Sequence, residues 1–190
     1  MTTTHTVVGV DPSLTATGIA STRGWCQTVG YTRARAKDPG ITQLPHPERR
    51  AALNNLRQTI LDTIGHPDLV VMELPAVSRS GGGAHERGWL WWTLYDRLTR
   101  LDIPIGLLTP NQRAQYATGK GTAGKGMVVD AVARRWPQWP TEGDDNAADA
   151  VTLMAAGCDW LGTPLTTVPQ THRNALTKAI WPAPPAQAAA

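Results

Sequence analysis

The sequence predicts an α/β fold built on a mixed sheet, in which a three-strand meander is followed by parallel strands and flanking helices. Short apolar runs at residues 7–10 and 69–72 are bounded by polar residues, proline or glycine, which is typical of strands covered on both faces. Apolar residues at helical spacing fill the stretches between the later runs. A meander followed by alternating helix and strand produces a mixed sheet flanked by helices.

The first third of the chain is expected to form the meander. After the run that ends at Asp11, residues 18–22 and 25–31 have the composition of two further strands, joined by a short turn at 23–24. Apolar residues at helical spacing then predict a helix over 47–65, where glycine and a following proline end it.

The later elements alternate between helix and strand. Residues 85–101 are predicted to be helical and 105–108 to form a strand, and Thr109 with Gln112 forms a capping box with proline at the first helical position. Two more helices are expected over 127–136 and 145–158. We therefore predict one domain over 1–162. Residues 163–190, rich in Pro, Thr and Ala, are predicted to be a short C-terminal appendage with room for one short helix over 171–180.

Composition restricts the class of protein. A chain of 190 residues with 41% hydrophobic and 17% charged residues has the make-up of a soluble globular domain. A net charge of +3 is compatible with nucleic-acid binding. Cys26 and Cys158 stand far apart, so neither a disulfide framework nor a zinc site is indicated. Because no apolar run approaches the ~20 residues of a membrane span and residues 1–5 are too polar for a secretory signal, we expect a cytoplasmic protein without a membrane partner.

Three groups of acidic residues are the most informative feature for function. Asp11 and Glu73 each close an apolar run, which predicts two charges at the carboxyl edge of the sheet, where open α/β sheets build their sites. The third group opens the helix over 145–158, where Asp149 has Asp145 and Asn146 on its own face, four and three residues earlier. Two of the groups also have a structural interpretation, because Asp11 precedes a proline in a turn-like segment and the residues at 144–146 are typical helix N-caps. Glu73 ends an apolar strand, where a buried charge needs a partner or a metal.

Carboxylates gathered from different elements predict a metal-dependent enzyme that acts on phosphates. Mg²⁺ takes oxygen ligands and keeps several waters, so a few Asp and Glu side chains suffice to bind it. Two such ions roughly 3.5–4 Å apart can activate a water and stabilise the leaving oxygen of a phosphodiester. We expect two Mg²⁺ ions at each active site, with Mn²⁺ able to substitute.

Four segments resemble the RuvC-type Holliday junction resolvases, which have an RNase H-like fold. Their sequences, in the family's order, are VGVDPSLTATG at 8–18, PDLVVME at 67–73, TGKGTAGK at 118–125 and DNAADA at 145–150. The resemblance covers about residues 6–157. It implies a Mg²⁺-dependent endonuclease that resolves Holliday junctions, forks and flaps, with Asp11, Glu73 and Asp149 as metal-binding catalytic carboxylates and Lys125 as the active-site lysine near the scissile phosphate. The wording of the motifs is most similar to resolvases of actinobacterial bacteriophages.

The chain departs from the family pattern at two places. The family has an acid three residues before the last aspartate, where this chain has Asn146. Either Asn146 binds metal through its carbonyl oxygen, or Asp145 does so from the neighbouring position. The chain contains no Phe, so the aromatic that the family places after the glutamate strand is absent. The loop over 78–84, with Arg79, either replaces it or is a mobile surface loop.

Basic and aromatic residues suggest two partners. The predicted DNA-binding residues are Arg79, Arg87, Arg113, Lys120 and Lys125. The last three belong to a basic stretch that extends to residue 135 and predicts a phosphate track, although a solvated face is the common alternative. Trp89 and Trp92 lie on the helix over 85–101 and point in different directions around it. One face of the helix can pack on the sheet, but the other aromatic side chains need a second cover, which indicates a subunit interface. The family's dimers pack through the corresponding helix, and a homodimer matches the paired nicks that a four-way junction needs.

Other functions compete with a nuclease. The stretch over 119–125 imitates a phosphate-binding loop, but glycine stands at 126 where that loop needs Ser or Thr, so no nucleotide cofactor is expected. The spacing Asp-x-x-x-Thr-x-x-Gly from Asp11 also resembles actin-like ATPases, whose two domains would not fit in this length. A non-catalytic scaffold for branched DNA remains open if Asn146 has removed the metal site, and so does cleavage of RNA–DNA hybrids.

Overall fold

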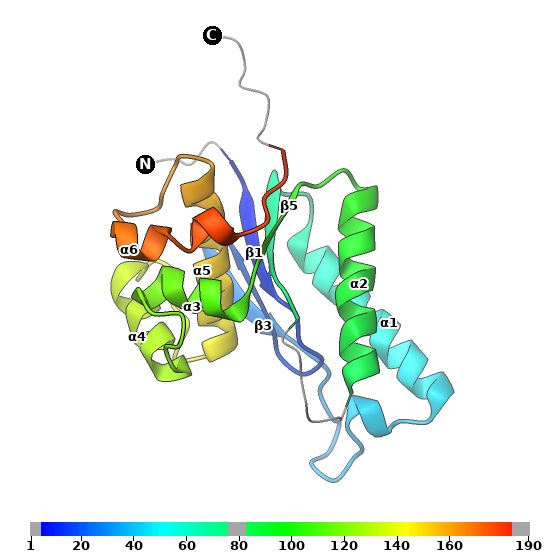
Figure 1. Ribbon diagram of the computed structural model, residues 1–190. Helices are drawn as coiled ribbons and strands as arrows, with labels where there is room; N and C mark the ends of the chain where they lie inside the picture. The colour runs from blue at the N-terminus through cyan, green and yellow to red at the C-terminus, as the bar shows by residue number, and fades with distance from the viewer. Residues whose placement is uncertain (1–4, 76–82, 184–190) are drawn as a thin grey trace.

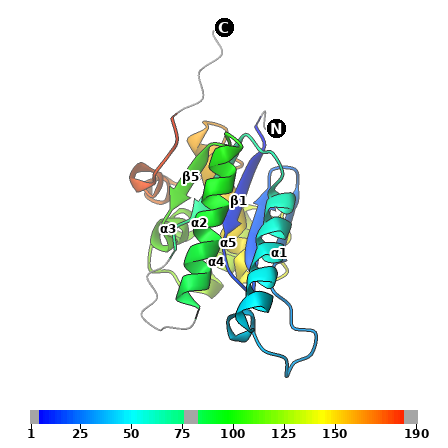
Figure 2. The same ribbon diagram turned by 90° about the vertical axis from the view of Figure 1, so that its right-hand side faces the viewer.

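The computed structural model describes residues 5–75 and 83–183 and shows a mixed sheet with helices on both faces (Figures 1 and 2). The sheet has five strands in the order β3-β2-β1-β4-β5. Their bounds are β1 (Val7–Asp11), β2 (Thr17–Ser21), β3 (Trp25–Val29), β4 (Leu69–Glu73) and β5 (Ile105–Leu108). The first three strands form an antiparallel meander, while β4 and β5 extend the sheet in parallel from β1. The predicted mixed sheet is confirmed.

The helices form two layers, one on each face of the sheet (Figure 1). One layer consists of α1 (His46–Ile64) and α2 (Ala84–Arg100), preceded by the short η1 (Ile41–Gln43). The other contains α3 (Pro110–Thr118), α4 (Lys125–Arg135) and α5 (Asp145–Trp160). The expected capping box begins α3, since the Thr109 hydroxyl accepts from the Gln112 N–H at 3.2 Å and the Gln112 side chain accepts from the Thr109 N–H at 2.7 Å.

Helix α5 lies unusually close to the sheet because two glycines leave room for it. A Cβ at Gly9 would overlap the backbone carbonyl of Ala150, and a Cβ at Gly18 would overlap that of Asn146. The alanine-rich face of α5 therefore packs directly on β1 and β2. This approach brings the first two turns of α5, including Asp149, down to the end of β1.

The C-terminal segment packs back on the domain as far as residue 183. The single short helix predicted over 171–180 does not form there. Two short helices replace it, α6 (Gln170–Arg173) and η2 (Leu176–Lys178). The chain then becomes extended because Ile180 exchanges backbone hydrogen bonds of 2.7 and 3.0 Å with Leu107 of β5. Trp181 follows and stacks on Trp160, with ring centroids 4.9 Å apart, so this tryptophan docks on the body of the protein.

No helix within residues 5–75 and 83–183 is long and apolar enough to cross a membrane.

Candidate active site

Three carboxylates meet at one edge of the sheet, as the sequence predicts. Asp11 ends β1 and Glu73 ends β4, and the parallel register pairs Val10 with Met72, so the two acids leave adjacent strands side by side. Asp149 comes to the same place from the second turn of α5. Counted over the whole residue, Glu73 and Asp149 are only 9% and 5% exposed to solvent. Little water is therefore left to solvate two negative charges.

Burial of these acids changes their protonation. The pKa of Asp11 is raised to about 8, first by burial and then by the neighbouring carboxylates of Glu73 and Asp149. Burial likewise raises the pKa of Asp149 to about 7, against the opposing effect of Arg113. The pKa of Glu73 is also raised by burial, again opposed by Arg113. A cluster in which several acids resist ionisation is a site that a cation would stabilise.

Arg113 supplies a cation to this cluster. Its Nε donates to Glu73 and its Nη1 donates to Asp149, so one guanidinium joins the two buried acids. The basic stretch predicted Arg113 to be a DNA-binding residue, whereas the structure places it among the predicted metal ligands with 13% of its side chain exposed. The sequence places Arg113 on the helix that directly follows β5, but its position beside the acids depends on the pairing of Leu108 with Glu73, which only the structure shows.

The start of α5 separates the two candidates for the fourth ligand. Asp144 is the N-cap, accepting from the backbone N–H groups of Asn146 at 2.8 Å and Ala147 at 3.3 Å. The side-chain amide of Asn146 also donates to Asp144, at 3.1 Å. Asp145 instead accepts from Lys125, and its charge is close enough to raise the pKa of Asp149. The negative charge next to the buried acids is therefore that of Asp145.

Trp91 is a supporting residue that sequence reasoning missed. Its indole Nε1 donates to the backbone carbonyl of Glu73 at 2.8 Å in a buried setting. The bond attaches the end of β4 to α2. Periodicity indicates that Trp91 belongs to a packed helix, but it does not identify a backbone carbonyl on another element as its partner.

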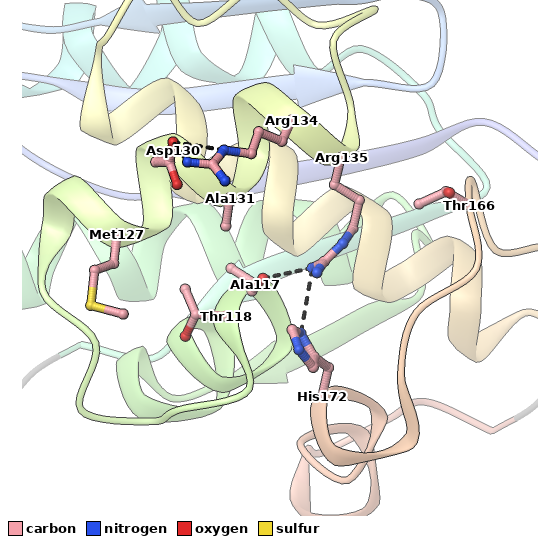
Figure 3. Close-up of a pocket in the computed structure, with 9 residues that line it drawn as sticks. All are labelled: Ala117, Thr118, Met127, Asp130, Ala131, Arg134, Arg135, Thr166 and His172. Carbon is pink, nitrogen blue, oxygen red and sulfur yellow. Dashed lines mark hydrogen bonds and ion pairs between the residues drawn. The ribbon is translucent and has the colours of Figure 1, made fainter.

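The basic residues of the predicted phosphate track contact several different groups of the protein. Arg134 pairs with Asp130 at 2.7 Å, and Arg135 donates to the Ala117 carbonyl at 2.6 Å and lies 3.4 Å from His172 Nδ1 (Figure 3). These residues line a groove of about 600 Å³ between α3, α4 and the C-terminal segment. Lys120 is exposed, and so is Lys125, despite its contact with Asp145. Arg87 is half-buried on α2, and Arg79 lies outside the described residues.

The proposed interface residues lie on α2. Trp92 is 64% exposed, whereas Trp89 is half-buried with the Arg57 guanidinium 5.9 Å from its ring centre.

The donor set of the acidic cluster suits a divalent metal ion. Asp11, Glu73 and Asp149 offer only carboxylate oxygens, the ligands that Mg²⁺ prefers. In residues 5–75 and 83–183, however, no group of three Asp, Glu, His or Cys side chains is arranged to hold a metal ion. Two of the acids are instead arranged around the Arg113 guanidinium.

A five-stranded mixed sheet of this order, with carboxylates at the ends of adjacent strands and on the helix beside them, defines an RNase H-like protein with a nuclease-type acidic site. No protein-family model matches the chain. Among curated proteins, it is 30% identical over 188 residues to the crossover junction endodeoxyribonuclease RuvC of Frankia alni, covering 95% of this chain and 91% of that protein. It is 31% identical over 157 residues to the RuvC of a Synechococcus species, covering 80% and 96%. The chain belongs to the RuvC family of crossover junction endodeoxyribonucleases.

Solved structures agree on the fold. Two structures of Thermus thermophilus RuvC, one of them in complex with a Holliday junction substrate, match with TM-scores of 0.52 and 0.56 at 21% identity. They cover 83% and 84% of this chain and 97% of their own lengths. The predicted RNase H-like fold is thereby confirmed.

Proposed function

We propose that this chain is a Mg²⁺-dependent endonuclease that cuts Holliday junctions and other branched DNA by paired nicks from a homodimer. The observation that carries the proposal is the convergence of Asp11, Glu73 and Asp149 at one sheet edge, in a member of a family of junction endonucleases. The likeness to bacteriophage resolvases stays a prediction. Because Cys26 and Cys158 are free thiols, the compartment that we propose is the cytoplasm.

The carboxylates would hold the metal, with Asp145 as the fourth acid. We favour Asp145 over Asn146 because Asp145 carries a negative charge close enough to act on Asp149, whereas the amide oxygen of Asn146 is a neutral donor. When bound, divalent ions supply activation of the attacking water and stabilisation of the leaving oxygen. Two ions and Mn²⁺ substitution are part of the proposal. Lys125 stands at the start of α4 after a glycine-rich loop, where its ammonium group could contact the scissile phosphate.

The remaining assignments concern DNA and the second subunit. Lys120 and Lys125 present exposed cations on the α3–α4 side of the site, and we propose that they contact phosphates, together with Arg87 and Arg79. We propose a homodimer through Trp89 and Trp92, supported by the exposed Trp92 ring on the outer face of α2. A two-fold dimer would present two active sites to opposite strands of a junction.

Cleavage of labelled four-way junction, fork, flap and linear duplex in Mg²⁺ tests this function. We expect symmetric nicks in the junction. The cleavage rate should fall by roughly 100-fold or more in Glu73→Gln because a metal ligand is removed. Glu48→Gln, an exposed glutamate in the first turn of α1, is the matched control and should cut normally. Ca²⁺ should support binding without cutting.

One outcome would favour the scaffold function instead. If the wild-type chain binds the junction tightly in Mg²⁺ or Mn²⁺ and never cuts it, the enzyme assignment is wrong. Asn146→Asp would then show whether this position is responsible, because restored cutting would mean that the amide has weakened an otherwise intact metal site. Loss of cutting in Asp145→Asn would instead support Asp145 as the fourth ligand.

A further inference from the structure

The acidic cluster already holds a cation that belongs to the chain. The Arg113 guanidinium donates from Nε to Glu73 Oε2 and from Nη1 to Asp149 Oδ1. Arg113 lies on α3, Glu73 on β4 and Asp149 on α5, so this single side chain connects three elements. All three side chains are largely buried, with exposed fractions of 13%, 11% and 7%.

Electrostatics explain why the guanidinium lies there. Two buried carboxylates beside Asp11 would repel one another and would lack solvation, and each must gain a partner to stay charged. A guanidinium is planar and presents several N–H donors in a fixed fork, so one Arg can satisfy two carboxylates at once. Lys125 also acts on the buried acids, but through space, since its hydrogen bond is to Asp145.

The same arrangement conflicts with metal binding. The oxygens that Arg113 engages on Glu73 and Asp149 are donor atoms for a divalent ion, and the described residues contain no preformed three-ligand site. Two cations in one small, poorly solvated cluster would repel each other. Metal entry therefore requires the guanidinium to withdraw from at least one acid.

We propose that Arg113 is the built-in counter-ion of the metal-free site and is displaced when a divalent ion binds. The inference rests on the proposed metal-dependent function and goes beyond it, because it makes Arg113 a positioning residue that competes with the metal. Arg113 keeps the ligands assembled before loading and lowers the apparent affinity for the ion. A competition of this kind couples two ligands at one site, for which roughly 5- to 150-fold changes in affinity are typical.

Binding of Mn²⁺, followed by its electron paramagnetic resonance signal at pH 8.5, tests the competition without any cleavage assay. We expect Arg113→Met to lower the Mn²⁺ dissociation constant by roughly tenfold. It should also lower the melting temperature in EDTA and enlarge the rise in melting temperature on adding Mg²⁺. Arg134→Met is the matched control, because it removes an arginine of the same helical layer whose ion pair is with the exposed Asp130, away from the proposed metal ligands. If Arg113→Met binds Mn²⁺ no more tightly than Arg134→Met, the competition is refuted.

A second measurement uses the wild-type chain, in case Arg113→Met does not fold. The Nε–H resonance of Arg113 is assigned by its absence from the spectrum of Arg113→Lys. During a Mg²⁺ titration we expect this resonance to move and to exchange faster with water as the guanidinium leaves the acids. An unchanged resonance at a Mg²⁺ concentration that saturates the melting-temperature shift would overturn the proposal. If no divalent ion binds the wild-type chain at all, the proposed function itself fails, and the two failures are thus distinguishable.

Discussion

Asp11, Glu73 and Asp149 share one buried corner of the sheet, and burial, more than the charges of the neighbouring acids, raises the pKa of each of them. Unfolded aspartates titrate near pH 3.9, whereas the folded chain raises the pKa of Asp11 to about 8 and that of Asp149 to about 7. The folded state therefore binds more protons than the unfolded state between these values. Its stability without metal must fall as the pH rises through this window.

A pH series of melting temperatures in EDTA checks this sign. We expect the melting temperature to fall from pH 5 to pH 8 and to level off above, and a change of about 1 kcal/mol moves it by about 2–4 °C in a chain of this size. Asp11→Asn should remove much of the dependence because it removes the most strongly raised pKa. Added Mg²⁺ should stabilise more at pH 8.5 than at pH 6, since its ligands must be deprotonated. A melting temperature that rises with pH for the wild type but not for Asp11→Asn would contradict the shift.

At the scale of elements, the ends of helices and strands could be predicted from local sequence signals, whereas contacts between distant segments could not. The helix and strand ends were accessible from sequence where a cap or a breaker marks them, as Thr109 does for α3. The Asp11 and Glu73 positions followed from strand order alone. The close approach of α5 was not predictable, because it depends on Gly9 and Gly18 meeting a helix more than a hundred residues away. Arg113 was misplaced for the same reason, since its two partners come from distant segments.

The C-terminal segment shows the same dependence on distant partners. Asp159 of α5 is 2% exposed, and it accepts from the Tyr116 hydroxyl at 3.1 Å and from Arg173 Nη2 at 2.8 Å. This buried carboxylate raises the pKa of Tyr116, after burial itself. Composition alone predicted an appendage over 163–190, because proline, threonine and alanine are common there. The ion pair to a single aspartate within an apolar helix is thus one anchor of this segment, beside the backbone pair of Ile180 with Leu107 and the stack of Trp181 on Trp160.

Arg173→Met tests that anchor. Removing the cation leaves Asp159 buried with Tyr116 as its one remaining side-chain partner among the residues that the structure describes, and a buried charge that loses its partner is destabilising. Because 46% of the Arg173 side chain is exposed, we expect about 1–3 kcal/mol, below the loss for a fully buried pair. Urea denaturation measures this change in the free energy of unfolding. Arg134→Met, which breaks the exposed pair with Asp130, is the control and should change that free energy by less than about 0.5 kcal/mol. Equal effects of the two substitutions would mean that the C-terminal segment is not held by this pair.

At the scale of the whole molecule, an exposed tryptophan stands out on the layer opposite α5. Trp92 is 64% exposed, and its ring stands edge-on to Trp91 at 4.9 Å and to Tyr95 at 6.0 Å. Helix α2 lies beside α1 on this layer (Figure 2). An exposed tryptophan on a platform of ordered aromatics is the kind of anchor that protein interfaces use.

Trp92→Glu tests the proposed dimer at this scale. A charge placed in a desolvated aromatic interface should prevent association, so we expect a monomer at micromolar concentration by sedimentation velocity where the wild type sediments as a dimer. Met127→Glu is the matched control, because Met127 is also an exposed apolar residue, 50% exposed, but lies on α4 of the other layer. The active-site carboxylates are untouched, so Trp92→Glu should still nick a junction, with nicks on opposite strands no longer paired. A dimer that persists in Trp92→Glu, or a monomeric wild type, would place the interface elsewhere or remove it.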